Sequence, residues 1–254
     1  MKSLSLLPLL SLSIPFVSAG TVLWSGLFNE SYTVDDFDKW SWSNSLPPWQ
    51  WYIHGSSPTS SYLSVSPDFK NPDSTLEEAQ GVRITIDGTS SWNGQTMMRS
   101  ELIPQVEGET DLGEGTAYYH FELSVTEANF PDAALEHQVA FFESHFTELK
   151  YGNADSDLTW YAGGSSHWST PLEAGVWYNF AYGIDFVAGT VSLYASTGGE
   201  KLELVAGPVA ANAETNSADW HVGVLRLDNG AEGGAEDWLW SGVFVEGGEI
   251  ALQV

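Results

Sequence analysis

The segment from Gln95 to Leu102 carries a basic and an acidic side chain that a strand would not need for folding. Side chains of a strand alternate between its two faces, so Arg99 and Glu101 share one face while Met98 points to the other. We therefore predict that the guanidinium and the carboxylate project side by side. A solvent-exposed ion pair, which contributes little to stability, is the alternative interpretation of this spacing.

A second carboxylate lies among aromatic residues in the segment from His137 to Glu148. Alternation along a single strand puts Phe141, Glu143 and His145 on one face. A carboxyl group with apolar neighbours tends to have a raised pKa, and such a group can act as a general acid. Glu143 is therefore predicted to lie mid-strand and to take part in proton transfer, with a solvated outer face of the strand as the alternative.

The segment from Trp220 to Arg226 adds a histidine to the candidate groups. Val222 and Val224 alternate towards a core, which leaves His221 on the opposite face of the strand. A single histidine more often has a structural role than a catalytic one. This segment therefore gains significance only beside the two carboxylates.

Glycoside hydrolysis requires at least two carboxyl groups close together, and two glutamates on neighbouring strands meet this requirement. One carboxylic acid protonates the leaving oxygen, while the other group acts as a base or a nucleophile. Other chemistries lack their usual signatures, because the chain has no His-Glu-x-x-His zinc motif, no Gly-x-Ser-x-Gly elbow, no dinucleotide fingerprint and no phosphate loop. The residue types therefore favour cleavage of a polysaccharide.

Strands are the elements that must position these side chains. Turn dipeptides such as Asp87-Gly88 and Asn93-Gly94 recur at short intervals and separate short segments of alternating hydrophobicity. Many short strands between regular turns predict an all-β sandwich, barrel or jelly roll. A Ser- and Pro-rich stretch from Ser56 to Ser74 is predicted to be a long ordered loop. We expect strands over Val82–Ile86, Thr96–Ile103, Tyr118–Val125, His137–Phe146, Trp177–Phe186, Thr190–Ala195, His221–Leu227 and Trp238–Glu246.

The first nineteen residues have the features of a secretory signal peptide. Lys2 supplies a positive charge, an apolar run extends from Leu4 to Val17, and Ala19 precedes a cleavage point before Gly20. Removing residues 1–19 from the 254-residue chain leaves residues 20–254, which we expect to form a single secreted domain. An uncleaved signal anchor is the alternative. The chain contains no cysteine, so the domain cannot depend on disulfides.

The chain is strongly acidic, with 34 Asp and Glu against 8 Lys and Arg and a formal charge of −26. This balance argues against binding to nucleic acid or to an anionic membrane surface, because both recruit Lys and Arg. It also opposes a polyanionic substrate at long range, which leaves a neutral polysaccharide. The 12 Trp, 10 Tyr and 12 Phe exceed what one core requires, and aromatic rings offer flat faces on which sugars stack.

Together the charged segments resemble glycoside hydrolase family 131, a family of fungal secreted β-glucanases. The resemblance rests on Thr96–Gln105, on His137-Gln138 with Phe141–Lys150, and on the Trp220-His221 strand, within a likeness that extends over most of the mature chain. It implies a β-jelly roll of two antiparallel sheets, with a concave sheet that forms an open substrate groove. It also implies β-glucans with 1,3, 1,6 or 1,4 linkages as substrates.

By the same resemblance, the catalytic glutamates correspond to Glu101 and Glu143, and the arginine and histidine of the cleft correspond to Arg99 and His221. Glu148 is an alternative to Glu143. Which glutamate is the acid and which is the base stays open. Further positions that are expected to support the site or bind substrate are Gln138, His145 and Trp49.

Two other functions fit a secreted all-β domain. A polysaccharide lyase of the glucuronan-lyase type resembles the same jelly roll, but it must neutralise a uronate, and only Arg99 is a cation of the proposed cleft. The second is a non-catalytic, lectin-like carbohydrate-binding domain, since fold does not fix function.

We expect a monomer that needs no cofactor, although its acid-rich loops could hold a structural calcium ion. A broad groove with room for a water favours inversion at the anomeric carbon.

Overall fold

The computed structural model describes residues 20–37, 47–53, 55–91, 95–153, 155–227 and 233–254, so the predicted signal peptide at residues 1–19 lies outside them. The strands are β1 (Thr21–Ser25), β2 (Trp49–Ile53), β3 (Leu63–Ser66), β4 (Gly81–Ile86), β5 (Met97–Pro104), β6 (Thr116–Val125), β7 (Glu136–Phe142), β8 (Thr147–Gly152), β9 (Asp155–Ala162), β10 (Ser165–Pro171), β11 (Tyr178–Asp185), β12 (Thr190–Thr197), β13 (Glu203–Ala210), β14 (Trp220–Leu227) and β15 (Glu236–Gly247). The short helical segments are α1 (Val34–Phe37), η1 (Thr59–Ser61) and η2 (Pro67–Phe69).

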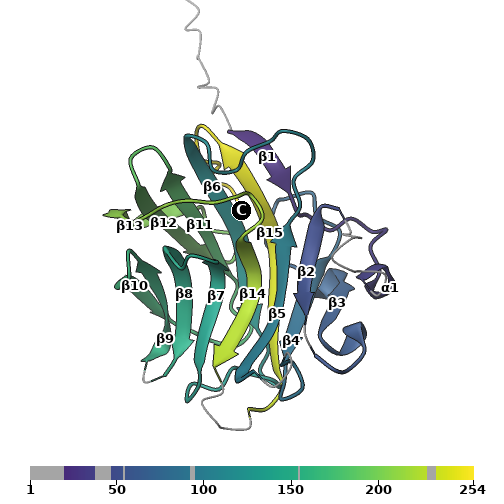
Figure 1. The fold of residues 1–254 in the computed structure, drawn as a ribbon. Helices are drawn as coiled ribbons and strands as arrows, with labels where there is room; N and C mark the ends of the chain where they lie inside the picture. The colour runs from purple at the N-terminus through teal and green to yellow at the C-terminus, as the bar shows by residue number, and fades with distance from the viewer. Residues whose placement is uncertain (1–19, 38–46, 54, 92–94, 154, 228–232) are drawn as a thin grey trace, which may run out of the picture.

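The strands form two antiparallel sheets that pack face to face (Figure 1). The eight-stranded sheet has the order β13-β12-β11-β6-β15-β4-β3, and β1 also pairs with β15. The seven-stranded sheet has the order β10-β9-β8-β7-β14-β5-β2 and lies in front in Figure 1. This arrangement is a jelly-roll sandwich, so the predicted fold class is confirmed.

Each predicted strand except one matches a strand of the structure to within two residues at either end. The exception is His137–Phe146, because β7 ends at Phe142 and residues 143–146 form the turn that leads into β8. Glu143 therefore follows the end of β7, and the prediction that it lies mid-strand is wrong. The predicted loop from Ser56 to Ser74 is also partly wrong, because it contains β3 as well as two short helical segments.

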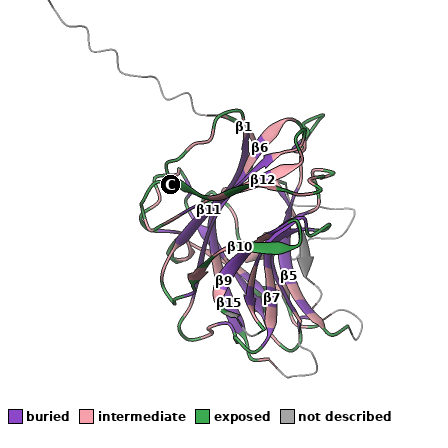
Figure 2. Ribbon diagram, turned by 90° about the vertical axis from the view of Figure 1, so that its left-hand side faces the viewer, coloured by how far each residue is buried: buried purple, intermediate pink, exposed green. Residues whose placement is uncertain are grey.

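Trp49 lies in the core and not among the substrate-binding residues where the sequence placed it. Its side chain is fully buried, and its ring packs edge-on against Trp24 with the centroids 4.7 Å apart. The indole Nε1 donates to the backbone carbonyl of Gly26 at 3.1 Å, which satisfies the polar end of the buried ring. Buried residues run along the strands of both sheets, whereas the edge strand β10 is exposed (Figure 2).

A β-bulge changes the face to which the side chains of β7 point. Two residues of β14, Val222 and Gly223, lie opposite the single residue Ala140 of β7. Ala140 has a φ of 47°, a left-handed conformation that few residues other than glycine adopt. Bulges of this kind re-aim the side chains next to them. As a result, Val139 points into the core while Phe141 lies on the outer face beside His221.

A buried ion triad joins the two sheets from the inside. Glu236 of β15 forms an ion pair with Arg226 of β14, whose Nη1 lies 3.0 Å from Glu236 Oε1, and His137 Nε2 of β7 lies 2.7 Å from Glu236 Oε2. All three side chains are buried. Burial disfavours the Glu236 carboxylate, but His137 and Arg226 outweigh this cost and hold the pKa of Glu236 below its usual value.

Replacing Glu236 with Gln should destabilise the protein strongly. Removing one partner of a buried ion cluster costs about 3–5 kcal/mol, because the remaining charge loses its compensation. We expect this loss in the free energy of unfolding from urea denaturation. The exposed Glu200→Gln variant provides the control and should change that free energy by less than about 0.5 kcal/mol. Equal stability of the two variants would show that the triad does not hold the sheets together.

Candidate active site

Glu101 forms a bidentate ion pair with Arg99 on the outer face of the seven-stranded sheet. Arg99 Nε donates to Glu101 Oε1 at 2.8 Å, and its Nη2 donates to Oε2 at 3.0 Å. Met98 and Leu102, the alternate residues of β5, belong to the core. The predicted side-by-side arrangement is therefore confirmed, and its bidentate geometry distinguishes it from a loose surface pair.

His221 stands between the two glutamates, because β14 lies between β5 and β7. Its Nδ1 lies 2.7 Å from Glu101 Oε2, and its Nε2 lies 3.0 Å from Glu143 Oε2. A protonated imidazole donates from both nitrogens, so each carboxylate can accept one of these protons. Val222 and Val224 face the core, as the alternation in the sequence predicts.

The two glutamates differ in their access to solvent. None of the Glu101 side chain is exposed, whereas 65% of the Glu143 side chain is exposed. The Glu143 backbone N–H donates to the carbonyl of Asp219 at 2.9 Å, which anchors the turn that follows β7. Arg99 Nη2 lies 4.0 Å from Glu143 Oε2. A ligand on this face therefore meets Glu143 directly and meets Glu101 only through its partners.

The charges of the site reinforce one another. Burial disfavours the ionised form of Glu101, yet His221 and Arg99 outweigh this effect and lower its pKa. The hydrogen bond from His221 lowers the pKa of Glu143 as well. Burial opposes the positive charge of His221, but the nearby glutamates raise its pKa to about 9. At neutral pH the site therefore holds an imidazolium between two carboxylates.

The sequence-based expectation of a raised pKa for Glu143 is wrong. That expectation assumed an apolar pocket around a mid-strand carboxylate. The structure instead exposes Glu143 at a strand end and places it close to His221 and Arg99, whose positive charges favour its ionised form.

His145 and Glu148 form a second imidazole–carboxylate pair beside the first. His145 Nδ1 lies 2.9 Å from Glu148 Oε2, and Lys150 Nζ lies 3.4 Å from Glu148 Oε1. Glu148 is buried against these partners and offers a substrate no open carboxylate. Gln138 lies on the same outer face, where its amide donates to Glu136 Oε1 at 3.1 Å.

Phe141 belongs to the site, although the sequence did not single it out as functional. Its ring lies parallel to that of His221, with the centroids 4.7 Å apart and 2° between the planes. The signal that could have found it is the adjacent pair Phe141-Phe142. Neighbouring residues of a strand point to opposite faces, so one of the two rings had to leave the core.

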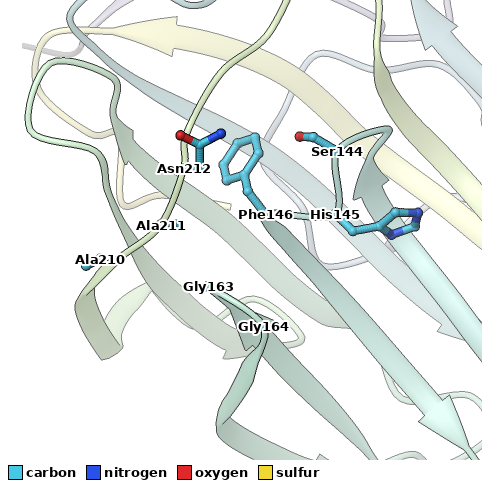
Figure 3. Close-up of a pocket in the computed structure, with 8 residues that line it drawn as sticks. All are labelled: Ser144, His145, Phe146, Gly163, Gly164, Ala210, Ala211 and Asn212. Carbon is cyan, nitrogen blue, oxygen red and sulfur yellow. The ribbon is translucent and has the colours of Figure 1, made fainter.

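A hollow of about 570 Å³ adjoins the turn that carries Glu143. In Figure 3, Ser144 and Asn212 lie on either side of Phe146, and the ring of His145 points away from them. This volume falls within the range of ligand-binding pockets. The residues that line the hollow are Ser144, His145, Phe146, Gly163, Gly164, Ala210, Ala211 and Asn212.

Within the described part of the chain, no group of three or more His, Cys, Asp or Glu residues is placed to hold a metal ion. The described helices are also too short and polar for any of them to cross a membrane.

Comparison with known proteins gives a consistent result. The family model for the glycoside hydrolase 131 catalytic N-terminal domain matches residues 22–250. The catalytic domain of the glycoside hydrolase family 131 protein from Coprinopsis cinerea is 53% identical with a TM-score of 0.86, covering 92% of this chain and 98% of that one. A family 131 β-glucanase catalytic domain from Podospora anserina is 48% identical with a TM-score of 0.86. The match covers 92% of this chain and 99% of the Podospora domain. No curated protein sequence matches the chain.

The protonation of His221 should make the stability of the protein depend on pH. The pKa of His221 in the folded state, about 9, lies above its ordinary value of 6.5. Proton binding there stabilises the fold fully below pH 6.5, and this contribution is lost as the pH rises to about 9. We expect the free energy of unfolding, measured in urea across this interval, to fall more in the wild type than in His221→Gln. Parallel pH profiles for the two proteins would contradict the assignment.

Proposed function

This chain belongs to glycoside hydrolase family 131, and we propose that this glycoside hydrolase is a β-glucanase that cleaves β-1,3-, β-1,6- and β-1,4-glucosidic bonds. The observation that carries the proposal is the exposed carboxylate of Glu143, which His221 links to the buried carboxylate of Glu101. Glycoside hydrolysis requires a proton for the leaving oxygen and a second carboxylate. Glu143 and His221 supply the proton, and Glu101 is the second carboxylate, which stabilises the charge of His221.

We assign the contact with the glycosidic oxygen to Glu143, because it is the exposed glutamate of the pair. The proton it needs lies on His221 Nε2, and a substrate that excludes water from Glu143 makes its ionised form less favourable. The proton can then pass from His221 through Glu143 to the leaving oxygen. The attacking water approaches the opposite face of the sugar and loses its proton to solvent, and His221 regains a proton from solvent, which restores the charge of the site. Glu101 supports this cycle by stabilising the imidazolium, and Arg99 keeps Glu101 in position.

The position of Glu101 supports an inverting mechanism, because this carboxylate lies too deep behind His221, and too far from Glu143, to act as the nucleophile of a retaining enzyme. Arg99 Nη2 lies 3.0 Å from Glu101 Oε2 and 4.0 Å from Glu143 Oε2, so these oxygens are at most 7.0 Å apart, the total of the two distances. An imidazole bound through both nitrogens lies between them, which keeps them roughly 6–7 Å apart. Retaining enzymes hold their two carboxyl groups at only about 5–5.5 Å, with no group between the nucleophile and the sugar.

The hollow beside Glu143 is the proposed place for glucose units next to the bond that is cleaved. It combines a polar hydroxyl and amide, from Ser144 and Asn212, with the glycine-lined turn at Gly163. A sugar ring offers hydroxyl groups to such polar atoms, and small residues allow it to approach the backbone closely. Ser144, which lines this hollow, directly follows Glu143 in the turn between β7 and β8.

We also propose that the mature protein, residues 20–254, is secreted and acts as a monomer without a required cofactor. The signal-like segment at residues 1–19 supports secretion. The formal charge of −26 supports a neutral glucan as the partner and makes nucleic acid and membrane surfaces poor ones.

Hydrolysis of laminarin, a β-1,6-glucan and cello-oligosaccharides, followed by proton NMR, tests this function. We expect new reducing ends whose first detected anomer is α, because inversion at a β-linkage produces the α-anomer. Glu143→Gln should lower kcat/KM by about 10²- to 10⁴-fold, the usual contribution of a general acid or base. Glu136→Gln, a change of the same type on the same face, is the matched control and should retain most of the activity.

Other outcomes would each contradict a specific part of the proposal. Unsaturated products that absorb in the ultraviolet would indicate a lyase. Glucan binding without any release of reducing sugar would indicate a lectin-like domain. Release of the β-anomer first would contradict inversion while leaving the hydrolase function intact.

A further inference from the structure

Phe141 combines features that packing alone does not explain. It is an aromatic residue on the polar outer face of the seven-stranded sheet, outside the core cluster, and yet only 1% of its surface is exposed. The chain reaches this arrangement through the left-handed Ala140, whose backbone conformation is unfavourable for a residue with a side chain. The bulge therefore carries Phe141 out of the core and into contact with charged groups.

Two imidazoles lie parallel to the Phe141 ring. The His221 ring is 4.7 Å from it at 2°, and the His145 ring is 5.1 Å from it at 6°, both measured between centroids. The guanidinium carbon of Arg99 lies 5.9 Å from the same centroid. An apolar ring thus lies between the elements that supply the charged groups, namely β5, β14 and the turn after β7.

We propose that Phe141 is a positioning residue of the active site, which fixes the plane of the His221 imidazole between Glu101 and Glu143 and favours its protonated form. The kinetic part of this inference rests on the proposed function, because it concerns the group that supplies the proton. The geometric part concerns His221 alone.

The hydrogen bonds of His221 leave one motion undetermined. Contacts at Nδ1 and Nε2 define an axis through the imidazole, and rotation about this axis tilts the ring without breaking either contact. A parallel ring at 4.7 Å removes that freedom. Because a small misplacement near the reacting atoms can reduce a rate about 10²-fold, the plane of this ring matters for proton transfer.

The electron-rich face of Phe141 also favours a positive charge on its neighbour. A cation over an aromatic face is stabilised by the ring, and most strongly when it is shielded from water. The protonated His221 satisfies this condition, since it is buried and parallel to the ring. The charged and titratable groups that face His221 from the surrounding elements are Glu101 and Arg99 of β5, Glu143 after β7, and Asp219 before β14, while His145 packs on the Phe141 ring.

The test compares Phe141→Leu, which removes the ring, with Phe141→Tyr, which keeps it. For Phe141→Leu we expect kcat to fall about 10- to 100-fold with KM nearly unchanged. The alkaline limb of the pH–rate profile should move to lower pH by about half a unit, because the imidazolium loses its aromatic partner. The pKa of His221, followed by NMR of its imidazole, should fall by the same amount. Phe141→Tyr should keep kcat, the alkaline limb of the pH–rate profile and the pKa of His221 at their wild-type values.

Phe180→Leu is the matched control, because Phe180 is equally buried but lies in β11 of the opposite sheet. If Phe141→Leu merely loses thermal stability as Phe180→Leu does, with kcat, pH profile and the pKa of His221 unchanged, the proposal is wrong. Should Phe141→Leu fail to fold, Phe141→Met replaces the ring with a flexible side chain of similar size and carries the same test. If the wild type cleaves no glucan, the proposed function fails, and the NMR titration still decides the role of Phe141.

Discussion

The site depends on the compensation of one buried negative charge. Glu101 is ionised although none of its side chain is exposed, and an unpaired carboxylate in that position would cost several kcal/mol. Arg99 and His221 occupy its two oxygens and provide that compensation. The strand order makes this compensation possible, since β14 pairs with β5 and so brings His221 to Glu101. The remaining nitrogen of His221 is then directed to Glu143.

β14 serves both faces of its sheet. Its outward His221 completes the charged cluster of the candidate active site, and its inward Arg226 completes the triad that joins the sheet to β15. The neighbouring strand β7 has the same double role, with His137 inside and Phe141 outside. The bulge at Ala140 makes this possible, because strict alternation would have placed these two residues on the same side of β7.

Alternation in the sequence was sufficient to predict the positions of the strands, the pairing of Arg99 with Glu101 and the outward direction of His221. It failed where the backbone departs from regular pleating. A left-handed alanine has no sequence signature comparable to glycine, so neither the bulge at Ala140 nor the turn after β7 was predicted, and Glu143 was assigned to an apolar mid-strand setting. Trp49 was misplaced for another reason: composition cannot tell a ring that binds sugar from one whose Nε1 is satisfied inside the core.

A double-mutant cycle on Glu101 and His221 tests most directly whether the buried carboxylate acts through the imidazole. The cycle compares kcat/KM of Glu101→Gln, His221→Asn and the double variant with the wild type, after each variant is shown to fold. If the two residues act as one unit, the double variant should lose about as much kcat/KM as the more damaging single variant. If the two single losses multiply in the double variant, Glu101 and His221 act independently, and the account given for this site is contradicted.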